Sequence, residues 1–220
     1  FCVVDENGLL VDRRAGRLPT SESERLVQKL RAIKLEGAEV FVEVVKEHRF
    51  VLVLRAPGLG TSLTDSDPLV TGAAPLKVQA LEASSERTAT LFNQFLEKAE
   101  GVLKNETPAN MVLLRGFAKF PVMPKYPDVF NLKAAAIAVN GMYRGVARLV
   151  GMDVLTVDGI DLRNEFDCLE KHWSDYDFFY LHFKKTDTYG EIGDFDAKVK
   201  AIEEFDAQLP RLMALNPDVV

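Results

Sequence analysis

Apolar positions follow two different patterns along the chain, and the clearer one lies in the C-terminal part. There, runs that are apolar nearly throughout alternate with stretches whose apolar residues have helical spacing. The runs KAAAIAV, MDVLTV and YDFFYLHF predict buried strands, and MYRGVARLVG, DLRNEFDCLEKHW and the stretch from Phe195 to Leu209 predict helices. Strands without a polar face, separated by helices, indicate a parallel α/β sheet with helices on both faces.

The N-terminal part contains more varied elements. Residues 20–35 and 85–104 have the apolar spacing of helices, and NMVLLRG predicts a buried strand. The stretch AEVFVEVVKEHRFVLVLRAPG holds two β-rich runs around Lys46-Glu47-His48 and predicts a hairpin. The proline- and aromatic-rich stretch FAKFPVMPKYPDVFNL is typical of a connector between domains.

Composition then restricts the class of protein. A chain of 220 residues suffices for one large domain or two small ones, and 47% hydrophobic with 27% charged residues is typical of a folded chain. A net charge of -6 argues against a general nucleic-acid binder. Two cysteines exclude a disulfide scaffold and favour a reducing, cytoplasmic setting. Because no apolar run approaches the roughly 20 residues needed to span a bilayer, we expect no membrane partner.

An acidic stretch follows the last predicted strand, at the edge where parallel sheets place their sites. The segment KKTDTYGEIGD, expected as a loop, places Asp187 and Glu191 four positions apart with Gly190 between them, so a turn could bring both carboxylates to one point. Divalent cations such as Mn²⁺ or Mg²⁺ prefer such oxygen ligands. The alternative is that these acids belong to a helix start, where Asp194 is best placed as the N-cap of the next helix.

Arginines form a second candidate group. Arg13 and Arg14 precede the first predicted helix, and Arg115 ends the run NMVLLRG. Arginine suits bidentate binding of phosphate and carboxylate. Asp65 and Asp67, in the loop LTDSDP, can accept hydrogen bonds from hydroxyls. Together these residues predict a small polyanionic substrate, although a solvated surface position is the alternative for any single arginine.

Five segments carry a resemblance to a known family. They are VDENGLLVDRRAGR, LVLRAPGLGTSLTDSDP, MVLLRGF, AIAVNGMYRGVARLVGMDVL and DFFYLHFKKTDTYGEIGDFDAKVKAIEEFD. They resemble successive segments of the cofactor-independent phosphoglycerate mutases of archaeal type, which belong to the alkaline phosphatase superfamily. The resemblance runs over essentially the whole chain, and its last segment is the most specific.

The resemblance implies an architecture. Residues 1–128 would be an inserted α/β domain that closes over the substrate, and residues 129–220 would be part of an alkaline-phosphatase-like core with a parallel sheet. The family places a nucleophilic serine before the position of Phe1 and a TGDH-like metal motif after that of Val220. We therefore expect a middle fragment of a longer enzyme, inactive in isolation.

The resemblance also implies an activity, which is the interconversion of 3-phosphoglycerate and 2-phosphoglycerate in glycolysis and gluconeogenesis. It proceeds through a phosphoserine and uses two divalent metal ions, Mn, Mg, Zn or Co, without bisphosphoglycerate. By position, Asp187 matches the metal-binding aspartate of the family, and Glu191 stands where the superfamily often has a histidine. Arg115 stands where related mutases have a substrate-clamping arginine, and Arg144 could replace the charge of a family lysine that is Met142 here.

Two alternatives remain at this point. The first is a phosphatase or another phosphotransferase on the same scaffold. The second is a noncatalytic α/β binding module that is complete at 220 residues. The residues alone do not decide between them.

Overall fold

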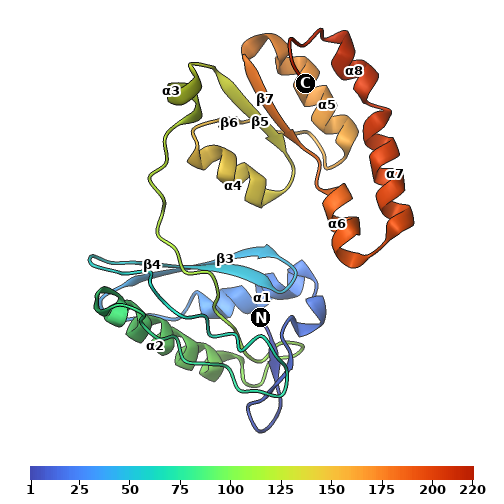
Figure 1. Ribbon diagram of the computed structural model, residues 1–220. Helices are drawn as coiled ribbons and strands as arrows, with labels where there is room; N and C mark the ends of the chain where they lie inside the picture. Colours follow the sequence, from blue (N-terminus) through green and yellow to red (C-terminus); the bar gives the residue numbers. More distant parts are fainter. The chain divides into compact units, whose positions relative to one another are not determined.

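The computed structural model describes all 220 residues, which form two compact units (Figure 1). Unit 1 is Phe1–Phe120 and unit 2 is Pro121–Val220. The sequence suggested a boundary at residue 128. The division in the structure comes earlier, because the helix α3 (Tyr126–Phe130) packs with unit 2. Tyr126 stacks on Phe178 with 4.8 Å between ring centroids, and its N–H donates to Val150 O at 2.6 Å.

Unit 1 is built from a hairpin and two long helices. Its elements are β1 (Val3–Val4), β2 (Leu10–Asp12), α1 (Thr20–Leu30), β3 (Glu39–Lys46), β4 (Arg49–Arg55) and α2 (Glu86–Leu103), with 3₁₀ turns at Ala15–Arg17 and Ala83–Ser85. The predicted hairpin is confirmed, as is the second predicted helix. The first predicted helix is shorter than its pattern suggested, because it ends at Leu30.

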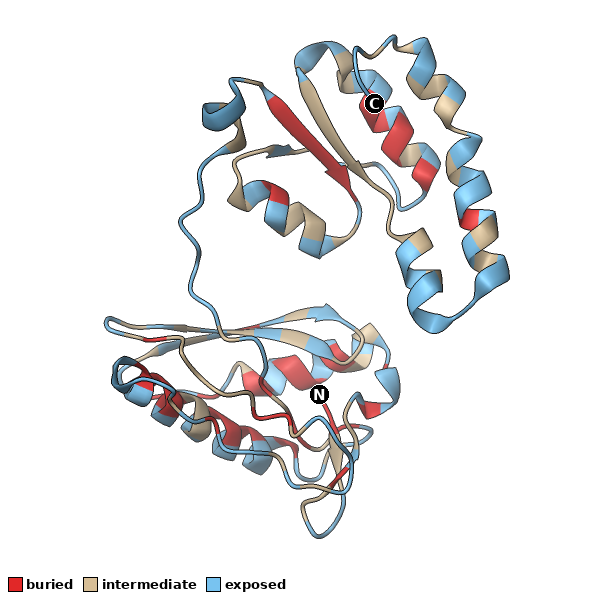
Figure 2. Ribbon diagram, viewed as in Figure 1, coloured by how far each residue is buried: buried red, intermediate tan, exposed pale blue.

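The core of unit 1 lies between the hairpin and these helices. β3 and β4 are antiparallel, with Phe41 opposite Val53 and Val42 opposite Leu52. Alternate residues face the core, so Val42 is 1% exposed whereas Phe41 is 39% exposed. Figure 2 shows the buried positions gathered on the inner stripes of α1 and α2. Phe95, at the centre of the α2 stripe, is fully buried.

The prediction of a strand at NMVLLRG is wrong, although the segment is buried as expected. Its only ladder contact is an isolated bridge between Met111 and Cys2. Leu114 instead bonds to a loop residue: its N–H donates to Ser66 Oγ at 2.7 Å, and its carbonyl accepts from Ser66 N at 2.9 Å. An apolar run signals burial, and here a serine from the long loop satisfies the backbone in place of a second strand.

Unit 2 is a small α/β layer structure. Its elements are α3 (Tyr126–Phe130), β5 (Ala134–Ala138), α4 (Gly141–Leu149), β6 (Asp153–Val154), α5 (Leu162–His172), β7 (Phe178–His182), α6 (Lys185–Ile192), α7 (Phe195–Asp206) and α8 (Leu209–Ala214), with a 3₁₀ turn at Trp173–Asp175. The three strands and the helices between them are confirmed, although β6 is limited to two residues. No helix of the chain combines the length and the hydrophobicity needed to cross a membrane.

The sheet of unit 2 is parallel, in the order β6-β5-β7. The chain moves from β5 outward to β6 and then across to β7. Right-handed connections therefore place α4 and α5 on opposite faces, as Figure 1 shows. Every residue of β5 is buried. The direction of winding changes between β5 and β7, and sheets of this kind bind ligands beyond the carboxyl ends of the strands at such a point.

The acidic stretch expected as a loop is the helix α6 (Lys185–Ile192), so that prediction is wrong. Gly190 lies inside this helix, and Gly193 ends it in a left-handed conformation with φ of 75°. Asp194 caps the next helix, as predicted, because its side chain accepts from Ala197 N at 3.0 Å. A glycine between two acids is compatible with a turn or a helix, and the C-terminal glycine fixes the helix.

Candidate functional site

Asp67 is the centre of a charged cluster in unit 1. Its carboxylate accepts two hydrogen bonds from Arg13, from Nε at 2.9 Å and from the Nη2 group at 2.7 Å. A second guanidinium, that of Arg115, lies 3.3 Å away. The Asp67 side chain is 2% exposed, whereas that of Arg115 is 58% exposed. The cluster therefore holds a buried carboxylate beneath two cations, of which one faces solvent.

Local backbone geometry positions Asp67 for this role. Its Oδ1 accepts from Leu69 N at 2.8 Å, closing a turn around Pro68. Burial disfavours the charged form, but the hydrogen bonds from Arg13 and Leu69 and the charge of Arg115 prevail, so the pKa of Asp67 lies below its usual value. Asp67 is thus a carboxylate at neutral pH and fixes the direction of the arginines.

Asp65 holds the other side of the Arg115 segment. Its Oδ1 accepts from Gly116 N at 3.0 Å, and its Oδ2 lies 3.9 Å from Arg115 Nε. Gly116 has φ of 68°, a conformation that favours glycine. Four of the five predicted substrate-binding residues of unit 1, namely Arg13, Asp65, Asp67 and Arg115, therefore lie together.

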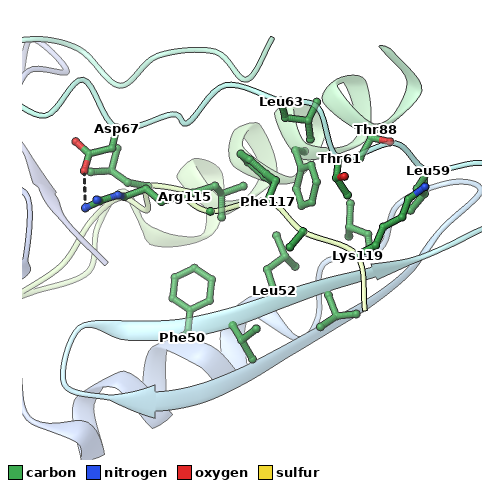
Figure 3. A pocket seen from close by; sticks show the side chains of 18 of the residues that line it. Phe50, Leu52, Leu59, Thr61, Leu63, Asp67, Thr88, Arg115, Phe117 and Lys119 are labelled. Atoms are coloured by element: carbon green, nitrogen blue, oxygen red, sulfur yellow. Dashed lines mark ion pairs between the residues drawn. The ribbon is translucent and has the colours of Figure 1, made fainter. Parts of the chain in front are cut away.

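An open groove of about 1140 Å³ begins at this cluster (Figure 3). Its lining includes Arg13, Arg14 and Arg115, so the structure also brings Arg14 to the same surface. In Figure 3, Asp67 and Arg115 lie at one end, and Phe50 and Phe117 border the apolar part. The apolar lining had no counterpart in the sequence analysis, because its residues come mainly from β4, from the loop after β4 and from the segment Leu113–Phe120, which are separate in the sequence.

The remaining predicted residues belong to unit 2. Arg144 lies in α4, in the second turn after the carboxyl end of β5, and no ion pair involves it. Nearby, the rings of Tyr143 and His182 stack with centroids 3.4 Å apart, and Lys184 Nζ lies 5.9 Å from the Tyr143 ring. Burial lowers the pKa of His182, so its imidazole is neutral at pH 7. These side chains join the ends of β5 and β7 in one cluster that sequence spacing did not show.

Asp187 and Glu191 lie one turn apart on α6, so their carboxylates share a face of the helix. Both are exposed, and Asp187 forms an ion pair with Lys184. No group of three or more histidine, cysteine, aspartate or glutamate side chains is close enough together to hold a metal ion. The pair could donate two oxygens to a cation, but a complete site needs further ligands.

Glu165 is a buried carboxyl that sequence reasoning did not single out. It lies in the first turn of α5, is 2% exposed, and its Oε1 accepts from Val139 N at 3.3 Å, just beyond the end of β5. Burial raises the pKa of Glu165 to about 7, against a smaller opposing effect of Val139 N–H and Lys185. The sequence signal was weak, because a glutamate in the first turn of a helix is ordinary.

The two groups differ in what they can bind. The unit 1 cluster presents guanidiniums suited to phosphate or carboxylate oxygens. Unit 2 presents a lysine, a neutral histidine and carboxylates near the carboxyl ends of two parallel strands. The first is an anion-binding arrangement, and the second contains oxygen donors for a cation.

Known proteins resemble this chain over nearly all of its length. A family model described as 2,3-bisphosphoglycerate-independent phosphoglycerate mutase matches residues 1–110. A protein of Thermus thermophilus named "Probable 2,3-bisphosphoglycerate-independent phosphoglycerate mutase" is 48% identical over 100% of this chain and 55% of its own length. A protein of the same name from Thermotoga maritima is 45% identical over 96% of this chain and 53% of its own.

Solved structures give the same picture. The cofactor-independent phosphoglycerate mutase of Thermoplasma acidophilum matches with a TM-score of 0.64 and 28% identity, over 93% of this chain and 58% of that one. The PH0037 protein of Pyrococcus horikoshii matches with a TM-score of 0.69 and 22% identity, over 90% and 51% of the two chains, and supports the fold alone.

The chain spans about half the length of the curated relatives that it matches. The family model nevertheless covers half of the chain, and the relatives continue the match through both units. The chain therefore belongs to the 2,3-bisphosphoglycerate-independent phosphoglycerate mutase family.

Proposed function

We propose that this chain forms two parts of a phosphoglycerate mutase that interconverts 3-phosphoglycerate and 2-phosphoglycerate without bisphosphoglycerate. Unit 1 would be the inserted domain that closes over the substrate, and unit 2 would be part of the metal-binding core. The phosphoryl group would pass through a serine that lies outside these 220 residues. The 48% identity to a relative of that name, over the whole chain, is the observation that carries the proposal.

The charged cluster of unit 1 supports a role in holding the substrate. Phosphoglycerate carries a phosphate and a carboxylate, and both are matched by the planar donors of arginine. Asp67 holds Arg13 through two hydrogen bonds, which leaves Arg115 and Arg14 as the exposed guanidiniums. In this proposal Arg115 and Arg14 bind the substrate anions, Asp67 and Asp65 orient the arginines, and Arg144 contributes charge from unit 2.

The carboxylates of α6 fit two divalent metal ions only in part. Asp187 and Glu191 would provide oxygen ligands, and the other ligands would come from residues of the same protein outside these 220. Bound divalent ions would neutralise phosphoryl charge and lower the pKa of a hydroxyl. Lys184, which pairs with Asp187 here, would exchange this contact for one with the substrate phosphate.

The test uses the complete polypeptide that carries these residues. Interconversion of the two phosphoglycerates is measured without bisphosphoglycerate, after chelation and after adding back Mn²⁺, Mg²⁺, Zn²⁺ or Co²⁺ one at a time. We expect Asp187→Asn to weaken metal affinity and reduce turnover by roughly 100-fold or more while the fold is retained. We expect Arg115→Ala to raise KM, because its guanidinium binds the ground state and the transition state alike.

Arg163→Ala is the matched control, since Arg163 is exposed on α5 and forms no ion pair. Normal metal affinity and turnover in Asp187→Asn would remove Asp187 from the metal site. Faster hydrolysis of other phosphomonoesters than mutase turnover would make the protein a phosphatase instead.

A further inference from the structure

The turn after β2 places three consecutive residues in a backbone conformation that few side chains favour. Ala15, Gly16 and Arg17 have φ of 48°, 62° and 52°. Residues with a Cβ rarely adopt this left-handed region, so a run of three such residues is unfavourable by itself. Some interaction from outside the three residues therefore holds the turn.

The carboxylate of Asp12 provides that interaction. Its Oδ1 accepts from Arg14 N at 2.7 Å, and its Oδ2 accepts from Gly16 N at 2.6 Å. These backbone hydrogen bonds, the one from Arg14 above all, lower the pKa of Asp12 below its usual value, although burial opposes them. Asp12 is thus ionised at neutral pH, and each of its oxygens holds one N–H group of the turn.

Asp12 thereby helps to fix both peptide groups of Arg14. The N–H of Arg14 donates to Asp12, and its carbonyl accepts from Arg17 N at 2.9 Å. The two peptide planes beside a residue determine where its Cβ points, so the turn sets the direction in which the Arg14 side chain leaves the backbone. Arg13, its neighbour in the same turn, is held separately, through the bonds of its side chain to Asp67.

The turn before β2 has the same pattern without an arginine. Asp5 Oδ1 accepts from Asn7 N and from Leu9 N, two and four residues further on, both at 2.9 Å. In that turn a glycine, Gly8 with φ of 77°, takes the left-handed position. One oxygen of Asp5 serves both bonds, whereas Asp12 uses both of its oxygens. Since an amide has a single acceptor oxygen, asparagine can replace Asp5 but cannot replace Asp12.

We propose that Asp12 is a positioning residue for substrate binding, which holds Arg14 in the orientation that meets a phosphate or carboxylate group of the substrate. The inference rests on the proposed function, in which Arg14 binds a substrate anion. Asp12 acts through Arg14 and does not touch the substrate, because the N–H groups of Arg14 and Gly16 occupy its two oxygens.

Hydrogen exchange in the 220-residue chain tests whether Asp12 holds the turn. In Asp12→Asn one of the two N–H groups loses its acceptor, so we expect the amide of Arg14 or Gly16 to exchange at least about fivefold faster than in the parent chain. Asp5→Asn is the matched control, and its turn should keep the exchange rates of the parent within about twofold. Unchanged exchange at both Arg14 and Gly16 would overturn the proposal.

Mutase kinetics of the complete polypeptide with 3-phosphoglycerate test the consequence for binding. We expect Asp12→Asn to raise KM about tenfold with kcat within about twofold of the parent, because Arg14 loses a charge-assisted bond that the ground state and the transition state share. Asp5→Asn should change neither constant. If Asp12 served folding alone, the molecules that remain native would keep the parent KM, and only kcat per mole of total protein would fall. That result, or two unchanged constants, would reject the positioning role.

Arg14→Ala separates the inference from the proposed function. It should raise KM to a similar extent, and Asp12→Asn should then add little, because both changes remove the same contact. Additive increases in KM would show that Asp12 acts elsewhere and would reject the inference. If the parent polypeptide lacks mutase activity, the proposed function fails and the inference fails with it. If the parent is active and Arg14→Ala raises KM whereas Asp12→Asn does not, the positioning role alone fails.

Discussion

At the scale of single residues, Asp67 shows how a buried charge is made tolerable. A carboxylate that loses its water is costly unless charged hydrogen bonds replace it. Arg13 supplies two of these bonds and Leu69 N–H a third, while Arg115 adds a nearby positive charge. The same contacts hold Arg13 in place. Asp67 is therefore a structural requirement as well as a candidate orienting group.

Removal of Asp67 should consequently cost stability. We expect Asp67→Ala to lower the free energy of unfolding by about 2–4 kcal/mol, because it leaves two guanidiniums without their buried partner. Asp65→Ala is the comparison. Asp65 is half-exposed and its ion pair with Arg115 is long, at 3.9 Å, so its removal should cost about 1 kcal/mol or less. Urea unfolding of both variants measures the difference. Equal losses would contradict a special role for Asp67.

Glu165 is a residue whose environment opposes its charge. Burial raises the pKa of Glu165 to about 7, so the folded chain holds this proton more tightly than the unfolded chain does. The stability that results is fully present below about pH 4.5 and is lost as the pH rises through 7. The loss amounts to about 3 kcal/mol at most.

Replacement by glutamine isolates this effect, since the amide oxygen of Glu165→Gln can still accept from Val139 N–H. We expect the variant to gain stability relative to the parent chain as the pH rises from 5 to 8, by up to about 3 kcal/mol. Urea unfolding at a series of pH values provides the measurement. Glu203→Gln, at an exposed position of α7 without an ion pair, should show no such trend. A pH-independent difference for Glu165→Gln would refute the raised pKa.

At the scale of elements, hydrophobic periodicity was sufficient for most of the fold. It predicted β5, β7, the hairpin and the long helices, because each buries a continuous stripe or face. It failed at NMVLLRG, where Ser66 and not a strand pairs with Leu114. A different expectation failed at α6, where a glycine between acids suggested a loop. At NMVLLRG a partner distant in sequence decides the backbone conformation, and at α6 a capping glycine decides it.

The candidate site was predictable to a similar degree. Residue type alone indicated Arg13, Asp67 and Arg115, and the fold brings them together. The stacking of Tyr143 on His182 and the burial of Glu165 could not be predicted, because both depend on which strand ends become neighbours in the sheet.

The contact between the long loop of unit 1 and α2 gives an element-scale prediction. Gly60 packs against the helix start: its N–H donates to Thr88 Oγ1 at 2.9 Å, and a Cβ at this position would lie 2.6 Å from Ser84 O. Gly60→Ala should therefore lower stability by about 1–3 kcal/mol. Gly101→Ala, in the last turn of α2 where no atom lies within 4 Å of the new Cβ, should raise it by up to about 1 kcal/mol. Thermal unfolding of both variants tests the signs, and two shifts of the same sign would contradict the packing.

At the scale of the whole molecule, the chain is two units joined by an exposed connector. Each unit has its own buried cluster, around Phe95 in unit 1 and around Phe166 in unit 2. Between them, Phe120 is 80% and Val122 is 100% exposed, and residues 117–124 make no backbone hydrogen bond. We therefore expect each unit to keep its fold when the connector is cut.

Limited digestion with trypsin tests this separation. Cleavage needs several residues of free, extended backbone, so we expect the first cut after Lys119, within the unbonded connector. Lys125 should resist, because its Nζ donates to Leu149 O and the next N–H donates to Val150 O. Mass spectrometry should find Phe1–Lys119 and Phe120–Val220 as lasting fragments, and Lys119→Gln should delay both. If the fragments disappear as quickly as they form, or the first cut falls inside a helix, the two units do not hold their folds independently.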